Sequence, residues 1–152
     1  MIPVDDPLVL GTDPRIEALL CSYRRYLGQP LCAATELFEA PFVVLAHGLE
    51  TPPLLFYGNR AALELWEMDW ASFTAMPSHR TAEPDLREAR ARLLSEVERR
   101  GFSTGYSGVR LSSSGRRFEI RGATVWNVLG LNGKRIGQAA AFSDFMALPG
   151  AP

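Results

Sequence analysis

Thiols and imidazoles are the side chains in this sequence that could do redox, metal or acid–base chemistry, and each occurs twice. Cys21 and Cys32 are too few for a disulfide scaffold and lack the CxxC spacing of redox and zinc motifs. We interpret both as reduced thiols, and a redox-sensitive role for Cys32 is the less favoured alternative. His47 and His79 are not part of any group of His, Cys, Asp and Glu with metal-ligand spacing, so no metal site is expected.

Nucleophilic and phosphate-binding motifs are not found in the chain. The serines of SSSG (residues 112–115) lack a GxSxG context, and GLNGKR (residues 130–135) lacks the spacing of a phosphate-binding loop. Both segments are typical of hairpin turns. With no catalytic constellation, we do not expect an enzyme, although a small cone-shaped α+β enzyme using Asp144 or His79 as general base stays open as an alternative.

Four polar residues lie on predicted strands where an apolar residue is expected if the strand only packs: Tyr106, Arg110, Thr124 and Gln138. A few convergent polar groups among aromatic side chains are typical of a small-molecule pocket. The same aromatic residues would also form a core without a ligand, and strand register decides between the two. The predicted ligand-binding set is Phe42, Trp66, Phe73, Tyr106, Arg110, Phe118, Thr124, Trp126, Gln138 and Phe142.

Local signals define the elements that would position these residues. Asp13 and Gly28 cap a helix, Asn59 and Asp69 cap two short helices, and Pro84 begins a long helix that ends before Gly101. Strands are predicted at 41–47 and 54–57, and a three-stranded meander runs from Tyr106 to Phe145 with turns at 112–115 and 131–134. On its middle strand, one parity is shared by Phe118, Ile120, Thr124, Trp126 and Val128, which are therefore expected on one face.

The order of these elements predicts an α+β fold. We expect a five-stranded antiparallel sheet with helices packed on one face, plus an N-terminal helix at 13–28, which is the plan of a PAS domain. One domain is expected over residues 13–148, after an N-terminal arm at 1–12.

Composition excludes several classes of protein. The 152 residues are 47% hydrophobic and 22% charged, as in soluble globular domains. Sixteen basic and seventeen acidic residues leave a net charge of -1, so nucleic acid is not an expected partner. The longest apolar runs are too short to span a membrane and the N-terminus lacks the basic start of a signal peptide, so a cytoplasmic protein is expected.

Three motifs resemble the MEKHLA family: NRAALELWEMDW (Asn59–Trp70), SGVRLSSSGRRF (Ser107–Phe118) and ATVWN (Ala123–Asn127). The resemblance covers nearly the whole chain, most clearly from Leu54 to Phe142. Members of that family are PAS-like, and occur as small stand-alone bacterial proteins and as the C-terminal domain of plant class III homeodomain-leucine-zipper proteins. This sequence is similar to the stand-alone bacterial type.

The resemblance implies a sensory or regulatory protein with the concave sheet face as a ligand site, and implies no catalytic residues. Flavin–cysteine photochemistry of the PAS class is excluded because both cysteines precede the first predicted core strand. Haem would need His47 or His79 as axial ligand, and neither lies in the long helix, so haem is left open but not favoured. The amphipathic helix around Ile16–Leu27 could pack against a second copy, and we expect a C2 homodimer.

The sequence thus favours a stand-alone PAS-like sensory or regulatory module that binds a small organic ligand between sheet and helices. Its signal would pass through a dimer surface or a partner signalling protein. The alternative is a ligand-free dimerisation or protein-interaction module, and the second alternative is the cone-fold enzyme.

Overall fold

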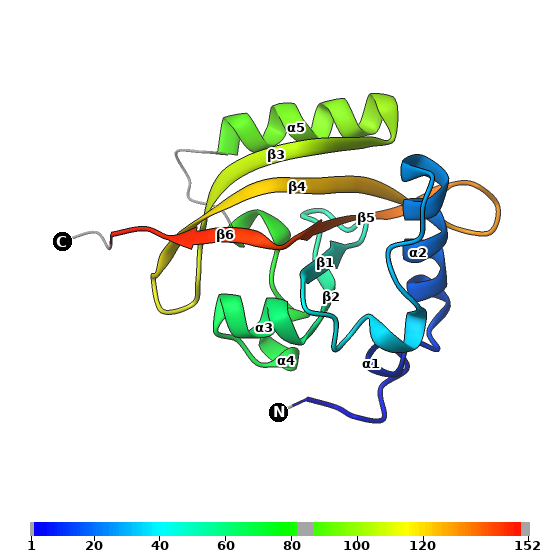
Figure 1. Ribbon diagram of the computed structural model, residues 1–152, viewed down its shortest axis with the longest axis horizontal. Coiled ribbons are helices and arrows are strands. Elements are labelled where there is room, and N and C mark those ends of the chain that lie inside the picture. The colour runs from blue at the N-terminus through cyan, green and yellow to red at the C-terminus, as the bar shows by residue number, and fades with distance from the viewer. Residues whose placement is uncertain (1, 82–86, 150–152) are drawn as a thin grey trace.

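A computed structural model describes residues 2–81 and 87–149, the side chains of 87–89 excepted (Figure 1). Within these ranges, no helix is both long and apolar enough to cross a membrane. The elements in chain order are α1 (Pro7–Leu10), α2 (Pro14–Leu27), η1 (Ala34–Glu36), β1 (Val43–His47), β2 (Leu55–Gly58), α3 (Arg60–Trp66), α4 (Trp70–Phe73), η2 (Ser78–Thr81), α5 (Arg87–Arg100), β3 (Phe102–Leu111), β4 (Arg117–Leu129), β5 (Arg135–Phe142) and β6 (Asp144–Ala147).

The strands form one antiparallel sheet in the order β2-β1-β5-β4-β3, which confirms the predicted α+β fold. The predicted last strand is divided into β5 and β6 at Ser143. Thr124 of β4 lies opposite Ala141 of β5, and Ile120 lies opposite Phe145 of β6, so both segments pair with β4 in one register. Because β6 continues β5 along β4, the five-stranded plan holds.

Helix boundaries follow the capping residues. Side chains of Asp13, Asn59 and Asp69 accept backbone N–H bonds at the starts of α2, α3 and α4, as expected. The predicted start of the long helix at Pro84 lies outside the described residues. The segment expected as an arm contains α1, whose Leu8 is buried in the core.

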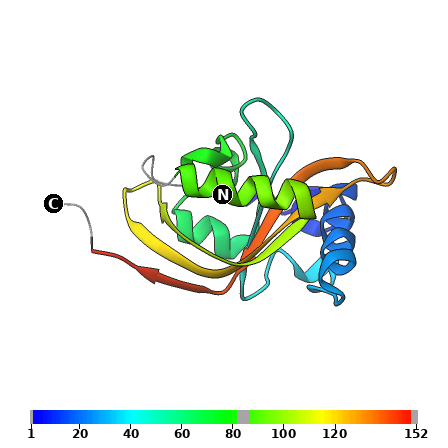
Figure 2. The ribbon, with the colours of Figure 1, turned by 90° about the horizontal axis from the view of Figure 1, so that it is seen from above.

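The two faces of the sheet are covered by different helices. Trp126 donates its ring N–H to the Leu19 carbonyl of α2 at 3.0 Å, and the next residue, Asn127, donates to the Val97 carbonyl of α5 at 3.1 Å. Consecutive strand residues point to opposite faces, so α2 and α5 lie on opposite sides of the strands (Figure 2). The apolar stripe of α2, with Ile16 and Leu19 fully buried, therefore packs against its own sheet and is not free for a second copy.

The middle of the meander contains a β-bulge that the sequence analysis did not predict. Ile120 pairs with Gly108 and Ala123 with Tyr106, so β4 has one residue more than β3 in this interval. Gly122 occupies the bulge with a φ of +66°, a conformation that glycine adopts without a Cβ penalty. Between Ser103 and Tyr106 the situation is reversed, because β3 has one residue more than β4 in that interval. Gly105 lies there with a φ of +76°.

The bulge makes the prediction of one shared face wrong. Phe118 and Ile120 lie on the face covered by α3 and α5, where the Phe118 ring contacts Trp66 at 5.2 Å between centroids. Beyond Gly122 the alternation is reversed, and Thr124, Trp126 and Val128 lie on the face of α2.

One buried amide joins the strands to the first helices. Asn59 is fully buried, and its Oδ1 accepts hydrogen bonds from the backbone N–H groups of Val44, at 3.0 Å, and Ala62, at 3.1 Å. Its Nδ2 donates to the carbonyls of Leu37, at 3.2 Å, and Phe42, at 2.8 Å. A primary amide has two donor and two acceptor positions, and here all four are used.

We predict that Asn59→Ala lowers the free energy of unfolding by about 4 kcal/mol, because buried backbone groups of β1 and α3 lose their partners. Urea unfolding followed by tryptophan fluorescence measures this change. The matched control is Asn132→Ala, since Asn132 accepts a single bond from Lys134 N in an exposed turn. The control should lose less than about 1 kcal/mol. Equal losses for the two variants would contradict the central role of Asn59.

Candidate functional site

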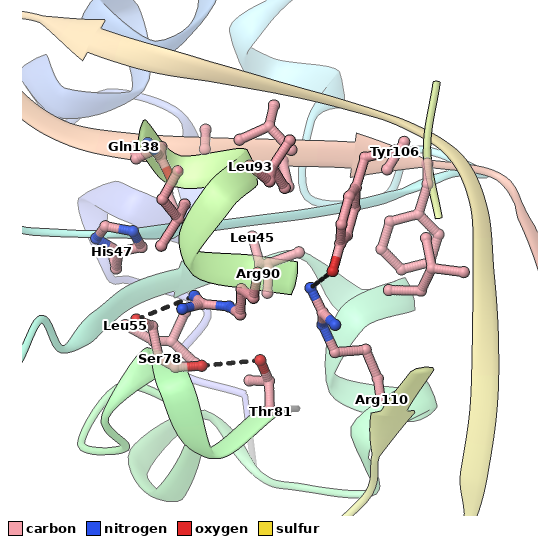
Figure 3. A pocket seen from close by; sticks show the side chains of 18 of the residues that line it. Leu45, His47, Leu55, Ser78, Thr81, Arg90, Leu93, Tyr106, Arg110 and Gln138 are labelled. Carbon is pink, nitrogen blue, oxygen red and sulfur yellow. Dashed lines mark hydrogen bonds between the residues drawn. The ribbon is translucent and has the colours of Figure 1, made fainter. Parts of the chain in front are cut away.

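A cavity of about 60 Å³ lies between α5, η2 and the inner face of the sheet (Figure 3). Most of its wall is apolar, with side chains from β1, β2, β3, β4, β5, α3 and α5. The residues that line it are Leu45, Ala46, His47, Leu55, Trp66, Ser78, Thr81, Arg90, Leu93, Leu94, Tyr106, Arg110, Ile120, Ala123, Val125, Gln138, Ala139, Ala140 and Phe142.

Arg110 and Tyr106 form the polar end of the cavity on β3. The Arg110 Nη2 donates to the Tyr106 hydroxyl at 2.9 Å, and its Nη1 donates to the carbonyl of Val109 at 3.2 Å. The guanidinium also lies over the Tyr106 ring, 5.3 Å from the centroid. The two residues share a strand face because they are an even number of positions apart, and Arg110 is only 7% exposed.

His47 and Gln138 lie opposite each other on β1 and β5. The Nδ1 of His47 is 2.9 Å from the Gly48 carbonyl, which assigns the ring proton to Nδ1 and leaves Nε2 as an acceptor. Nε2 is buried and has no hydrogen-bond partner among the described residues. Burial lowers the pKa of His47, and the nearby charges of Arg90 and Arg135 lower it further, against the opposing effects of the Gly48 bond and of the adjacent Gln138 side chain.

Further polar groups of the cavity lining come from η2, which supplies the hydroxyls of Ser78 and Thr81, and from α5, which supplies the guanidinium of Arg90. The Thr81 hydroxyl donates to the Ser78 carbonyl at 2.8 Å, and Arg90 Nη2 lies 3.5 Å from the Ser78 hydroxyl. Sequence analysis missed Ser78 and Thr81 because SHRT (residues 78–81) has no helical or strand periodicity. It also missed His47 as a cavity residue, although its alternation with Val43 and Leu45 indicates a shared face.

Half of the residues predicted for ligand binding line the cavity: Trp66, Tyr106, Arg110, Gln138 and Phe142. The other half lie elsewhere. Phe42 and Phe118 line a separate groove of about 350 Å³ beside β6. Phe73 packs against Trp66, with ring centroids 6.1 Å apart. Thr124 and Trp126 lie on the opposite face because of the Gly122 bulge.

The MEKHLA domain model matches residues 14–147 of this chain. The chain belongs to the MEKHLA domain family. No curated protein shows significant similarity to it.

Solved structures similar to this MEKHLA domain have PAS-type folds. The PAS domain of a protein from Colwellia psychrerythraea superposes with a TM-score of 0.64 at 16% identity, covering 76% of this chain and 92% of that one. A light-oxygen-voltage domain superposes with a TM-score of 0.61 at 10% identity, covering 76% of this chain and 84% of that one. The light-state dimer of the fungal blue-light photoreceptor Vivid superposes with a TM-score of 0.55 at 11% identity, covering 67% of this chain and 76% of that one. At these identities the likeness establishes a PAS-like fold.

The residues present do not fit the flavin chemistry of light-oxygen-voltage domains. Cys21 is exposed on α2, Cys32 follows that helix, and neither lines the cavity. Burial raises the pKa of Cys32 and the charge of Glu36 raises it further, which keeps the thiol protonated. A cavity of about 60 Å³ is also too small for a flavin or a haem. Asp144, the other residue considered for acid–base chemistry, is exposed on β6 and does not line the cavity.

We predict that the protein loses stability as the pH falls from 7 to 5. The folded-state pKa of His47 lies below its ordinary value of 6.5, so the unfolded chain binds the proton more readily. The free energy of unfolding therefore decreases once the pH falls below about 6.5. Melting temperatures measured across this range test the effect.

The matched variant is His47→Asn, whose amide can still donate to the Gly48 carbonyl but does not titrate. Its melting temperature should change less between pH 7 and pH 5 than that of the wild type. An identical slope in both proteins would show that His47 is not the group responsible.

Proposed function

We propose that this MEKHLA domain is a cytoplasmic, non-catalytic sensory or regulatory module that binds a small organic ligand in the cavity beneath α5. The observation that carries the proposal is the unused hydrogen-bonding capacity of buried groups in its lining. His47 Nε2 and Trp66 Nε1 have no partner among the described residues, and only two bonds are found there for Arg110, which has five N–H donors.

Buried polar groups without partners are rare in folded proteins, because each loses its bonds to water and gains none in return. In a core built only for packing, apolar residues at these positions would be more stable. A ligand that bonds to these groups restores what burial removes, and the apolar wall then excludes water from the contacts.

The size of the cavity limits the ligand. One water needs roughly 10 to 15 Å³ of cavity space on this measure, so a cavity of about 60 Å³ accommodates a molecule of few heavy atoms. A larger ligand would require α5 to move away from the sheet. Of the elements around the cavity, α5 forms its outer wall and contributes Arg90, Leu93 and Leu94.

The outer face of the same strands offers a surface for a second copy or a partner signalling protein. Val109, Glu119 and Met146 lie side by side across β3, β4 and β6, on the face opposite the helices α3 and α5. Met146 is 45% exposed, and α2 covers only the other end of this face (Figure 2). The Vivid structure, which has a similar fold, is a dimer. We propose that the module forms a C2 homodimer or a partner complex through this end of the sheet.

A ligand-free interaction module is the second candidate function. The small volume of the cavity favours it, because drug-sized ligands occupy pockets of roughly 300 to 1,000 Å³. In that case the outer face alone would carry the function.

We predict that the wild-type protein co-purifies with a small molecule, and that Ala140→Leu, which adds bulk to the cavity wall, abolishes its binding. Native and denaturing mass spectrometry of one freshly purified sample measure ligand occupancy, and the absorption spectrum detects any chromophore. The control is Ala147→Leu, which adds the same bulk at an exposed position of β6.

Wild type and control should carry the ligand in native spectra and release it on denaturation. Retention of the ligand by Ala140→Leu would place its site outside the cavity. Wild-type protein that binds no small molecule, but forms a dimer by light scattering, would favour the interaction module.

A further inference from the structure

We propose that the ligand of this cavity is a short-chain carboxylate whose head group pairs with Arg110. This inference rests on the proposed function, since it assumes that the cavity binds a small molecule, and it identifies the chemical class of that molecule.

Arg110 differs from the described arginines that form ion pairs, because it is buried and they are exposed. Arg15, Arg60, Arg100, Arg116 and Arg121 each lie within 3.6 Å of a carboxylate, and their side chains are between 45% and 68% exposed. Arg110 is 7% exposed, and the ion pairs found between described residues do not include it. Its two partners, the Tyr106 hydroxyl and the Val109 carbonyl, are uncharged.

A buried guanidinium with no counter-ion among the described residues is in an unfavourable environment. Removing a charge from water is costly, and this loss is offset only by an opposite charge with good geometry. Arginine cannot lose its proton to relieve the penalty, as a lysine can. The missing negative charge is therefore expected from a molecule that enters the cavity.

The shape of the lining selects a carboxylate over an inorganic anion. A planar carboxylate accepts two parallel N–H bonds from a guanidinium, so it can use donors that Tyr106 and Val109 leave free. Leu45, Leu93, Ile120 and Val125 form apolar walls around the remainder of the cavity (Figure 3). Phosphate or sulfate would place oxygen atoms against these walls, whereas a short aliphatic chain packs there. The volume of about 60 Å³ restricts that chain to very few carbons.

Matched pairs of small molecules test directly whether the ligand must carry a negative charge. The full chain, with isotopically labelled backbone amides, is titrated by NMR with acetate and propionate, and separately with acetamide and propionamide, which have nearly the same shape without the charge. We expect the carboxylates to shift the amides of Ile120, Val125 and Gln138 and to bind at least about tenfold tighter than the neutral amides.

Two variants separate Arg110 from positive charge in general. Arg110→Met keeps an unbranched side chain without the charge and should weaken propionate binding at least about tenfold. Arg92→Gln removes a charge from an exposed position on α5 and should leave the affinity unchanged.

Stability provides a readout that does not depend on affinity. In buffer free of carboxylates, Arg110→Met should melt at or above the wild-type temperature, because an uncompensated buried charge is removed. Propionate should raise the melting temperature of the wild type, since it binds only the folded state, and should not raise that of Arg110→Met. A variant that melts well below the wild type in both conditions would show that Arg110 has a structural role and would overturn the proposal.

The outcomes distinguish the two levels of inference. Propionamide that binds in the cavity as tightly as propionate would overturn the carboxylate assignment and support the proposed function. Propionate binding that survives in Arg110→Met, or that shifts only residues away from the cavity, would also overturn the assignment. If neither the probes nor any co-purifying molecule binds, the proposed function itself fails.

Discussion

The four hydrogen bonds of Asn59 are the constraint on which the rest of the structure depends. This residue ends the turn from β2 into α3, and its amide bonds to β1, to the first turn of α3 and to two carbonyls of the segment before β1. β1 supplies Leu45 and His47 to one side of the cavity, while α3 supplies Trp66 to another. Asn59 thus holds together two elements, β1 and α3, that both contribute side chains to the cavity wall.

The other end of α3 is fixed as firmly, by a different kind of contact. Glu67 follows the helix in a left-handed conformation, with a φ of +58°, and its carboxylate accepts hydrogen bonds from Ser112 and Ser114 in the hairpin between β3 and β4. These bonds lower the pKa of Glu67, which is held as an acceptor for the hairpin. α5 is attached to β4 through the side chain and backbone of Asn127, which bond to Val97 and Gly101 near its C-terminal end. The cavity is therefore framed by two helices that are each anchored on the meander.

Signals between near neighbours in the sequence were sufficient for most of the fold. Capping residues such as Asp13, Asn59 and Asp69 define helix starts because they bond to backbone groups two or three residues away. The antiparallel pairing of β4 with β5 follows from the hairpin at Asn132 and Gly133, whereas the pairing of β1 with β5 joins segments far apart in the sequence. The composition of the candidate site was harder to predict, because it depends on which face each strand residue occupies. Strict alternation assigned Thr124 and Trp126 to the cavity face, and one bulge reverses that assignment. An isolated glycine within a predicted strand, here Gly122, is the signal that could have indicated the bulge.

The irregularities at the middle of the meander also couple the lengths of its strands. Gly105 adds one residue to β3, and Gly122 adds one to β4. In the last strand, Phe142 and Phe145 both face the helices although they are three positions apart, because the chain is irregular at Ser143, between β5 and β6. Loss of one residue from a single strand would turn every side chain beyond that point to the wrong side. Losses matched in all three strands would leave the pairing intact. Length variation in this part of the chain during evolution is therefore restricted to coordinated changes, whereas the turns that join the strands can lengthen or shorten independently.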